Sequence, residues 1–245
     1  MNLLEVQGLR KTYPDFRLED VSFSVPEGAV MGLIGRNGAG KSTTLKSILG
    51  LVHPDAGRVE MFGREFSENE RYIKENIGVV LGGIDFYPKK KVRTITDVTR
   101  RFYSNWQEEK YRHYLDLFAI DENKRVDQLS SGMRVKYLLA LALSHNARLL
   151  ILDEPTSGLD PVSRDELAEL LRRIAADGTR SVLFSTHITS DLEKCASHIT
   201  FIQEGRLQRS DTLAGFMAHY ADLGSTLEEI IVAAERRPYD ADAII

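Results

Sequence analysis

The spacing of apolar and polar residues along this chain predicts an α/β fold. Short apolar runs, each of the length of a buried strand, occupy Ala29–Ile34, Ile77–Leu81, Leu149–Leu152 and Arg180–Ser185. Helix-forming stretches such as Thr43–Leu49 and Arg134–Ser144 lie between them. Because strands and helices alternate, we expect a doubly wound sheet with helices packed on its faces.

One long segment interrupts this alternation, since Thr94–Ser144 has a helical pattern only. Within it Tyr111, Tyr114, Leu115 and Phe118 recur at spacings of three and four residues, which predicts one buried helix face. We interpret the segment, about residues 94–144, as a helical subdomain inserted into the core and not as a separate domain.

The pattern after Asp211 predicts two further helices. Thr226-Leu227-Glu228-Glu229 has the spacing of a capping box at the start of the second helix, and Asp177-Gly178 and Glu204-Gly205 indicate turns. We therefore divide the chain into a core domain, residues 1–210, and a C-terminal helical tail, residues 211–245.

Composition limits the possible function classes. The chain has 245 residues, 42% of them apolar, and a net charge of −4, which argues against a general nucleic-acid binder. The single Cys195 excludes an internal disulfide and fits a reducing cytoplasm. The start Met1–Glu5 lacks the features of a signal peptide, and the apolar run Tyr137–Leu143 is too short for a membrane span. We expect any transmembrane pathway to come from another chain.

A complete phosphate-loop motif follows the first of the buried strands. The motif has the pattern G-x-x-x-x-G-K-[ST]. Its glycines allow backbone N–H groups to surround phosphate oxygens, while Lys41 reaches the β- and γ-phosphates and Ser42 ligates Mg²⁺. The helix that begins at Lys41 adds the positive end of its dipole. The alternative is a glycine-rich turn that has only a steric role, but such a turn would not need Lys-Ser directly after its last glycine. The predicted nucleotide-binding residues here are Gly35, Arg36, Asn37, Gly38, Ala39, Gly40, Lys41, Ser42 and Thr43.

Two adjacent acids end the strand Leu149–Leu152. Asp153 and Glu154 are therefore expected at the carboxyl edge of the sheet, where open α/β sheets bind ligands. We predict that Asp153 holds the Mg²⁺ shell and that Glu154 orients or deprotonates the attacking water. An acidic turn exposed to solvent is the ordinary alternative, and the nearby phosphate loop makes it less favoured.

The motifs around these acids resemble those of the ATP-binding subunit of an ABC transporter. Leu129-Ser130-Ser131-Gly132-Met133 precedes the acids and Pro155-Thr156-Ser157-Gly158-Leu159-Asp160 follows them. The resemblance implies an ABC-type P-loop ATPase with a mixed sheet core. It also implies a head-to-tail dimer in which Ser130 and Gly132 of a second subunit face the γ-phosphate, and it assigns Asp160 to the nucleotide site. An N-cap serine beside a glycine is the ordinary reading of the first motif.

Two further residues gain a role only from this resemblance. His187, in Phe184-Ser185-Thr186-His187, is similar in position to the family's switch histidine, which contacts the γ-phosphate and the attacking water. We therefore assign catalysis to Glu154, His187 and Lys41. Tyr13 resembles the aromatic residue that stacks on adenine, although a half-exposed aromatic residue in a turn is the alternative.

The resemblance is more specific in two stretches, Leu139–Glu166 and Phe184–Glu193. They resemble the ATPases of bacterial peptide exporters, above all the phenol-soluble-modulin and antimicrobial-peptide exporters. It implies a peripheral subunit at the cytoplasmic face of the cell membrane that works with transmembrane permease subunits. Amphipathic or antimicrobial peptides are the implied cargo. The alternative is a soluble ABC-type ATPase that acts as an assembly or scaffold factor.

The chain departs from the family pattern at two places. A glutamine that binds Mg²⁺ and contacts the permease is expected after Ile77–Leu81, but the sequence has Gly82 there. Asp85 can substitute as a hard oxygen ligand, water can fill the position, or permease docking can complete the site. In the signature, Ser131 and Met133 replace the usual Gly and Gln.

A basic cluster follows the position of the missing glutamine. Lys89, Lys90, Lys91 and Arg93 come after the aromatic pair Phe86-Tyr87. In the family this region faces the membrane and receives the permease, and four cations near an anionic leaflet would add roughly 1 kcal/mol of attraction each. A charge run exposed to solvent is an equally good interpretation.

Overall fold

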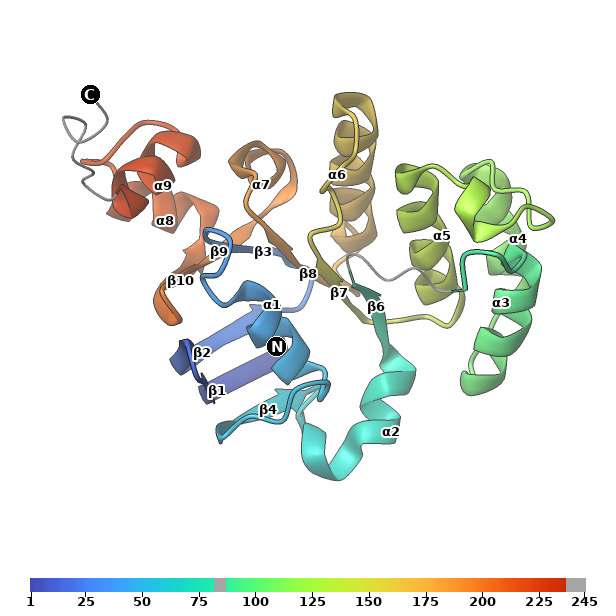
Figure 1. The fold of residues 1–245 in the computed structure, drawn as a ribbon, viewed down its shortest axis with the longest axis horizontal. Helices are drawn as coiled ribbons and strands as arrows, with labels where there is room; N and C mark the ends of the chain where they lie inside the picture. Colours follow the sequence, from blue (N-terminus) through green and yellow to red (C-terminus); the bar gives the residue numbers. More distant parts are fainter. Residues whose placement is uncertain (82–86, 237–245) are drawn as a thin grey trace.

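The computed structural model describes residues 1–81 and 87–236 and consists of one curved mixed sheet with helices on both faces (Figure 1). The order of strands in the sheet is β5-β4-β1-β2-β10-β9-β3-β8-β7-β6. The strands are β1 Asn2–Tyr13, β2 Phe16–Pro26, β3 Val30–Ile34, β4 Ala56–Met61, β5 Arg64–Glu65, β6 Ile77–Leu81, β7 Leu149–Asp153, β8 Ser181–Thr186, β9 His198–Gln203 and β10 Arg206–Thr212.

The helices lie between these strands and after them. They are α1 Lys41–Ile48, α2 Phe66–Asn76, α3 Val92–Thr99, α4 Glu108–Leu117, α5 Ser131–Ser144, α6 Pro161–Ala175, α7 Thr189–Cys195, α8 Leu213–His219 and α9 Leu227–Glu235, with short 3₁₀ turns at Arg100–Phe102 and Val126–Gln128.

The sheet has a parallel part and an antiparallel part, which confirms the predicted mixed sheet. Strands β6, β7, β8, β3 and β9 run parallel, whereas β1 pairs antiparallel with β2 and β4. The predicted apolar runs form β3, β6, β7 and β8, each within a residue or so of the expected bounds. Because all four are parallel, their carboxyl ends meet at one edge of the sheet.

Alternate residues of the parallel strands pack into two different cores. On β7, Leu150 and Leu152 face one core with helices α5 to α9, whereas Leu149 and Ile151 face the other with α1 and the N-terminal strands. This period of two is the expected consequence of strand geometry. Burial on both faces holds β3, β7 and β8 in a fixed register, so the loops at their carboxyl ends start from rigid positions.

The helical segment between β6 and β7 has a third core of its own. Val92, Tyr111, Leu115, Tyr137 and Leu141 are among its buried residues. Tyr111 and Leu115 are buried, and Tyr114 and Phe118 are partly buried, so the predicted helix face is confirmed. Figure 1 shows α3, α4 and α5 together beyond β6, at the opposite side of the parallel strands from α1.

The tail packs on the parallel part of the sheet. Phe216 of α8 and Leu227 and Ile230 of α9 are fully buried in the same core as β3 and β8. The predicted capping box is confirmed, because the Thr226 hydroxyl accepts from the Glu229 N–H at 3.2 Å and the Glu229 carboxylate accepts from the Thr226 N–H at 3.2 Å. Strand β10 runs to Thr212, so the domain boundary drawn after residue 210 falls inside a strand.

The helices of the described part of the chain are each too short or too polar to cross a bilayer.

Candidate functional site

The phosphate loop joins β3 to α1 and requires glycine for steric reasons. A Cβ atom on Gly35 would lie 2.2 Å from the carbonyl oxygen of Ile202, and Gly40 has a φ of +113° with the Phe16 ring 3.0 Å from where its Cβ would be. Gly40 is the N-cap of α1 and makes no side-chain cap. The first N–H groups of α1 are therefore available to an anion.

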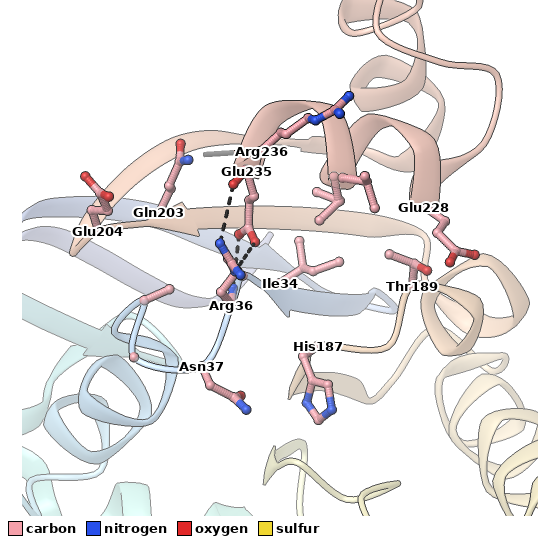
Figure 2. A pocket seen from close by; sticks show the side chains of 15 residues that line it. Ile34, Arg36, Asn37, His187, Thr189, Gln203, Glu204, Glu228, Glu235 and Arg236 are labelled. Carbon is pink, nitrogen blue, oxygen red and sulfur yellow. Dashed lines mark hydrogen bonds and ion pairs between the residues drawn. The ribbon is translucent and has the colours of Figure 1, made fainter. Parts of the chain in front are cut away.

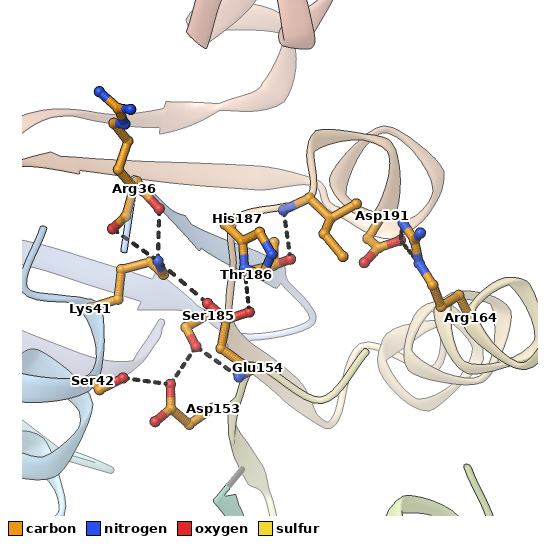
Figure 3. A network of polar contacts seen from close by, with 12 residues as sticks. Arg36, Lys41, Ser42, Asp153, Glu154, Arg164, Ser185, Thr186, His187 and Asp191 are labelled. Carbon is orange, nitrogen blue, oxygen red and sulfur yellow. Dashed lines mark hydrogen bonds and ion pairs between the residues drawn. The ribbon is translucent and has the colours of Figure 1, made fainter. Parts of the chain in front are cut away.

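Lys41 lies inside the loop and is nearly fully buried, with an exposed fraction of 5%. Its ammonium donates to the Gly35 carbonyl at 2.7 Å and to the Arg36 carbonyl at 3.2 Å, and it lies 3.4 Å from the Glu154 carboxylate (Figure 3). The cation thus fixes the start of the loop and at the same time faces the acids of β7.

The two acids lie next to the loop at the end of β7, as predicted. Asp153 accepts from the Ser42 hydroxyl at 3.1 Å and from the Ser185 hydroxyl at 2.6 Å. Ser185 in turn accepts from the backbone N–H of Glu154 at 2.9 Å. Parallel pairing of β7 and β8 puts Asp153 opposite Ser185, so the register itself creates this contact.

Glu154 points away from Asp153 toward the end of β8. Its carboxylate lies 2.8 Å from Nδ1 of His187, the predicted switch histidine (Figure 3). Its backbone has a φ of +50°, a conformation that residues with a side chain seldom adopt. This unusual backbone turns the chain between the two acids, so that one carboxylate faces Ser42 and the other faces Lys41 and His187.

The oxygen atoms at Ser42 and Asp153 fit a Mg²⁺ ion. A hydroxyl and a carboxylate are hard donors, and Mg²⁺ is commonly bound by one or two protein ligands together with phosphates and water. Within the described residues, groups of three or more His, Cys, Asp or Glu side chains that could hold a metal by themselves are absent.

Tyr13 lies at the end of β1 with 38% of its surface exposed. Its ring is 6.5 Å from that of Phe16, and Phe16 approaches Gly40 of the phosphate loop. The two rings thus form an aromatic surface beside the loop. The position is suitable for stacking on a base, and that role for Tyr13 stays a prediction.

Ser130 and Gly132 at the start of α5 lie beside the start of α6, because a Cβ atom on Gly132 would be 3.4 Å from the Ser163 hydroxyl, which donates to Asp160 at 2.6 Å. Ser130 caps α5 by accepting from the Met133 N–H at 3.2 Å, and Asp160 caps α6 by accepting from the Val162 and Ser163 N–H groups at 3.0 Å each. The hydrogen bonds, above all those from Ser163, hold the pKa of Asp160 below its ordinary value. The N-cap alternative therefore describes Ser130 correctly within one chain, and the nucleotide roles of these three residues stay predictions.

The predicted metal ligand Asp85 and the glutamine position at Gly82 lie outside the described residues. Leu81, the last residue of β6, pairs with Asp153 of β7.

Sequence reasoning missed two residues that contact the site. Ser185 was given no role of its own and was named only in the run before His187. Its position at the end of a predicted strand, like that of Asp153, could have indicated that the two residues are close. Glu235, the last residue of α9, accepts from the Arg36 N–H at 3.0 Å (Figure 2). The sequence contains no local signal for this contact, because the two residues are far apart in the chain.

A cavity of about 1050 Å³ opens between the phosphate loop and α9. Its lining includes Gly35 to Ala39, His187, and Glu228, Ile231 and Glu235 of α9. Figure 2 shows His187 below Arg36 and Glu235 above it. The predicted loop residues thus face an open space of a size that fits a large ligand.

Comparisons with known proteins agree on one family. The family described as ABC transporter matches residues 18–157. That match includes the phosphate loop, Ser130, Gly132 and both acids, and it ends before Asp160 and His187.

Individual relatives match over most of the chain. The bacitracin transport ATP-binding protein BcrA of Bacillus licheniformis is 32% identical over 208 residues, which are 84% of this chain and 68% of that protein. The Nod factor export ATP-binding protein I of Burkholderia orbicola is 37% identical over 209 residues, 83% of this chain and 68% of that protein. A solved structure of an ATP binding subunit of an ABC transporter has a TM-score of 0.84 at 28% identity and covers 96% of this chain.

Proposed function

Since this chain belongs to the ABC transporter family and is an ATP-binding subunit with ATPase activity, we propose that it powers an exporter through separate permease subunits. The observation that carries the proposal is the continuous polar network at the carboxyl edge of β3, β7 and β8. It connects the phosphate-loop lysine to Glu154 and the switch histidine directly, and to Asp153 through Ser185 (Figure 3).

Each residue of the network has a distinct part in hydrolysis. The N–H groups of the loop and the Lys41 ammonium bind the phosphates and offset their charge. Glu154 accepts a proton from the water that attacks the γ-phosphate. His187 lies 2.8 Å from the Glu154 carboxylate, orients the attacking water and contacts the same phosphate. Tyr13 stacks on the base.

Ser42 and Asp153 hold Mg²⁺ in this proposal. The ion, when bound, offsets negative charge on the phosphates. Ser185 keeps Asp153 in place by donating to it at 2.6 Å. Asp85 is proposed as a further oxygen ligand in place of the missing glutamine.

A second copy or a related ATPase completes the site in a head-to-tail dimer. Ser130 and Asp160 are the N-caps of α5 and α6, and Gly132 lies in the first turn of α5. These two helices pack in one core of the sheet, whereas α1 packs in the other. In the proposed dimer, a nucleotide bound to the phosphate loop of one chain contacts the signature of the other chain. Ser130, Gly132 and Asp160 take part in nucleotide binding through these contacts between subunits.

The basic cluster is the proposed contact with the membrane side of the complex. Lys89, Lys90, Lys91 and Arg93 are all exposed, and Tyr87 has an exposed fraction of 71%. An apolar cavity of about 300 Å³, lined by Leu81 and Ile95 among others, lies beside the segment that carries the cluster. A mostly apolar cavity close to a cationic segment suits a permease segment at an anionic leaflet, and this supports the proposed location at the cytoplasmic face of the membrane.

Amphipathic, membrane-active peptides of the phenol-soluble-modulin or antimicrobial type are the proposed cargo. The relatives compared above are named for two different cargoes, bacitracin and Nod factor, so the shared ATPase does not specify the cargo. Support for peptides comes from the resemblance of Leu139–Glu166 and Phe184–Glu193 to peptide exporters. Amphipathic helices also partition into the bilayer interface, where an exporter can collect them.

Two experiments test the proposal. Turnover is measured in lipid bilayers with and without the cognate permease, and again for Asp85→Ala. We expect weak basal hydrolysis that rises with the permease, because a site lacking one ligand is incompletely organised. Equal rates in all three samples would remove the coupling to a permease and the role of Asp85.

The cargo is tested in the host. Deletion of the gene is expected to reduce survival against amphipathic helical peptides or secretion of endogenous ones. If neither changes while Lys41→Ala causes an unrelated assembly defect, the scaffold alternative is correct and the ATPase assignment remains.

A further inference from the structure

The end of α9 contacts the phosphate loop directly. Glu235 is buried, with an exposed fraction of 8%, and its carboxylate accepts from the backbone N–H of Arg36 at 3.0 Å. The Arg36 guanidinium lies 3.7 Å from the same carboxylate, but that side chain is 63% exposed (Figure 2). The backbone hydrogen bond is therefore the stronger of the two contacts.

The Arg36 N–H belongs to the same peptide group as the Gly35 carbonyl. In a trans peptide these two groups point in opposite directions. Lys41 donates to that carbonyl at 2.7 Å, while Glu235 accepts from the N–H at 3.0 Å. One peptide plane is thus held by a cation on one side and an anion on the other. Both bonds are charge-assisted, and each polarises the peptide in the direction that strengthens the other.

Helix α9 is a firm support for this contact. Leu227, Ile230 and Ile231 are buried in the main core, and the Leu227 N–H donates to Glu193 of α7 at 2.9 Å. At the other end of α9, the Gln203 side chain donates to the Ala234 carbonyl at 3.2 Å. Anchors at both ends fix the position of Glu235 relative to the sheet.

We propose that Glu235 is a positioning residue for the nucleotide site, which holds the Gly35–Arg36 peptide in the orientation that receives Lys41. The buried carboxylate keeps the mouth of the loop in its binding shape before the nucleotide arrives. Burial raises the pKa of Glu235 above its ordinary value, and the Arg36 hydrogen bond and the positive charges of Arg36 and Lys41 offset part of that rise. The contacts that orient the peptide thus also act in favour of the charged carboxylate.

The contact also links docking of α9 to occupancy of the site. If a docked α9 raises the affinity for nucleotide, a bound nucleotide must stabilise docking by the same factor. The inference rests on the nucleotide site of the proposed function and is independent of permease and cargo.

The test measures binding of a fluorescent ATP analogue to the full chain in the presence of Mg²⁺. For Glu235→Ala we expect a roughly tenfold rise in Kd, the effect of one charge-assisted hydrogen bond. Glu235→Gln keeps the acceptor without the charge and has the shape of glutamate, so a smaller rise is expected. Asp222→Ala is the control, because Asp222 is an exposed acid shortly before the same helix and is not among the residues that line the cavity.

A second readout separates positioning from a general loss of structure. Hydrogen exchange of residues 227–235 is expected to slow when the analogue binds the parent chain, and this slowing should be lost in Glu235→Gln. Parental Kd and parental protection in Glu235→Gln and Glu235→Ala would overturn the inference. A parent chain that fails to bind the analogue at all would instead refute the nucleotide site itself.

Discussion

Replacement of Ser185 by alanine tests whether the link between the two acids matters for hydrolysis. The Ser185 hydroxyl is fully buried, donates to Asp153 at 2.6 Å and accepts from the Glu154 N–H at 2.9 Å. A bond to a carboxylate contributes about 2 kcal/mol and a neutral one about 1 kcal/mol. The free energy of unfolding should therefore fall by on the order of 3 kcal/mol. Turnover should fall about 10–100-fold, because both acids lose their common anchor.

The assay is phosphate release at saturating ATP and Mg²⁺, together with urea unfolding of the same samples. Ser181→Ala is the control, since Ser181 is a buried serine of the same strand whose hydroxyl donates to the Pro26 carbonyl at 2.8 Å. That variant should lose stability while its turnover stays close to the parental value. If the two variants lower turnover equally, Ser185 acts only through stability and the reasoning from its two hydrogen bonds is wrong.

Three other perturbations have expected outcomes. Glu154→Gln should slow hydrolysis by about 10²–10⁴-fold in a phosphate-release assay while binding of a fluorescent ATP analogue persists, and parental turnover would remove Glu154 as the base. Burial lowers the pKa of His145 from 6.5 to about 4, so between these pH values the unfolded chain takes up a proton that the folded chain does not. Stability should then fall by about 3 kcal/mol as pH drops from 6.5 to 4, and urea unfolding of His145→Phe should show a flatter pH dependence. Replacing Lys89, Lys90 and Lys91 by glutamine should weaken binding to anionic vesicles by about 100-fold, and unchanged binding would favour a solvated charge run.

The sequence alone predicted the chemistry that is encoded locally. Three such features depend only on residues close in the chain. They are the run from Ala29 through the phosphate loop, the acids after Leu152 and the capping box at Thr226. Their elements appear within a residue or so of the expected bounds. Short-range patterns suffice here because strand burial, glycine conformation and helix capping are local properties.

The contacts that sequence reasoning missed depend on tertiary packing. The N-terminal strands β1 and β2 pair antiparallel, which the alternation of strands and helices did not indicate. Glu235 reaches Arg36 only because α9 packs against α7 and lies in the same core as β3. In the sequence, an acid at the end of an amphipathic helix looks like any exposed residue. Ser130 is a plain N-cap within one chain, so its predicted role at the nucleotide depends on a second subunit.

The left-handed backbone at Glu154 sets stability against activity at one position. A φ of +50° is unfavourable for glutamate and is readily adopted by glycine, so Glu154→Gly would relieve the strain at the end of β7. The same change would remove the carboxylate that lies beside Lys41 and His187. Laboratory evolution that rewards thermal tolerance alone would thus drift toward an inactive protein at this site. Any stabilisation campaign on this chain needs a simultaneous selection for turnover.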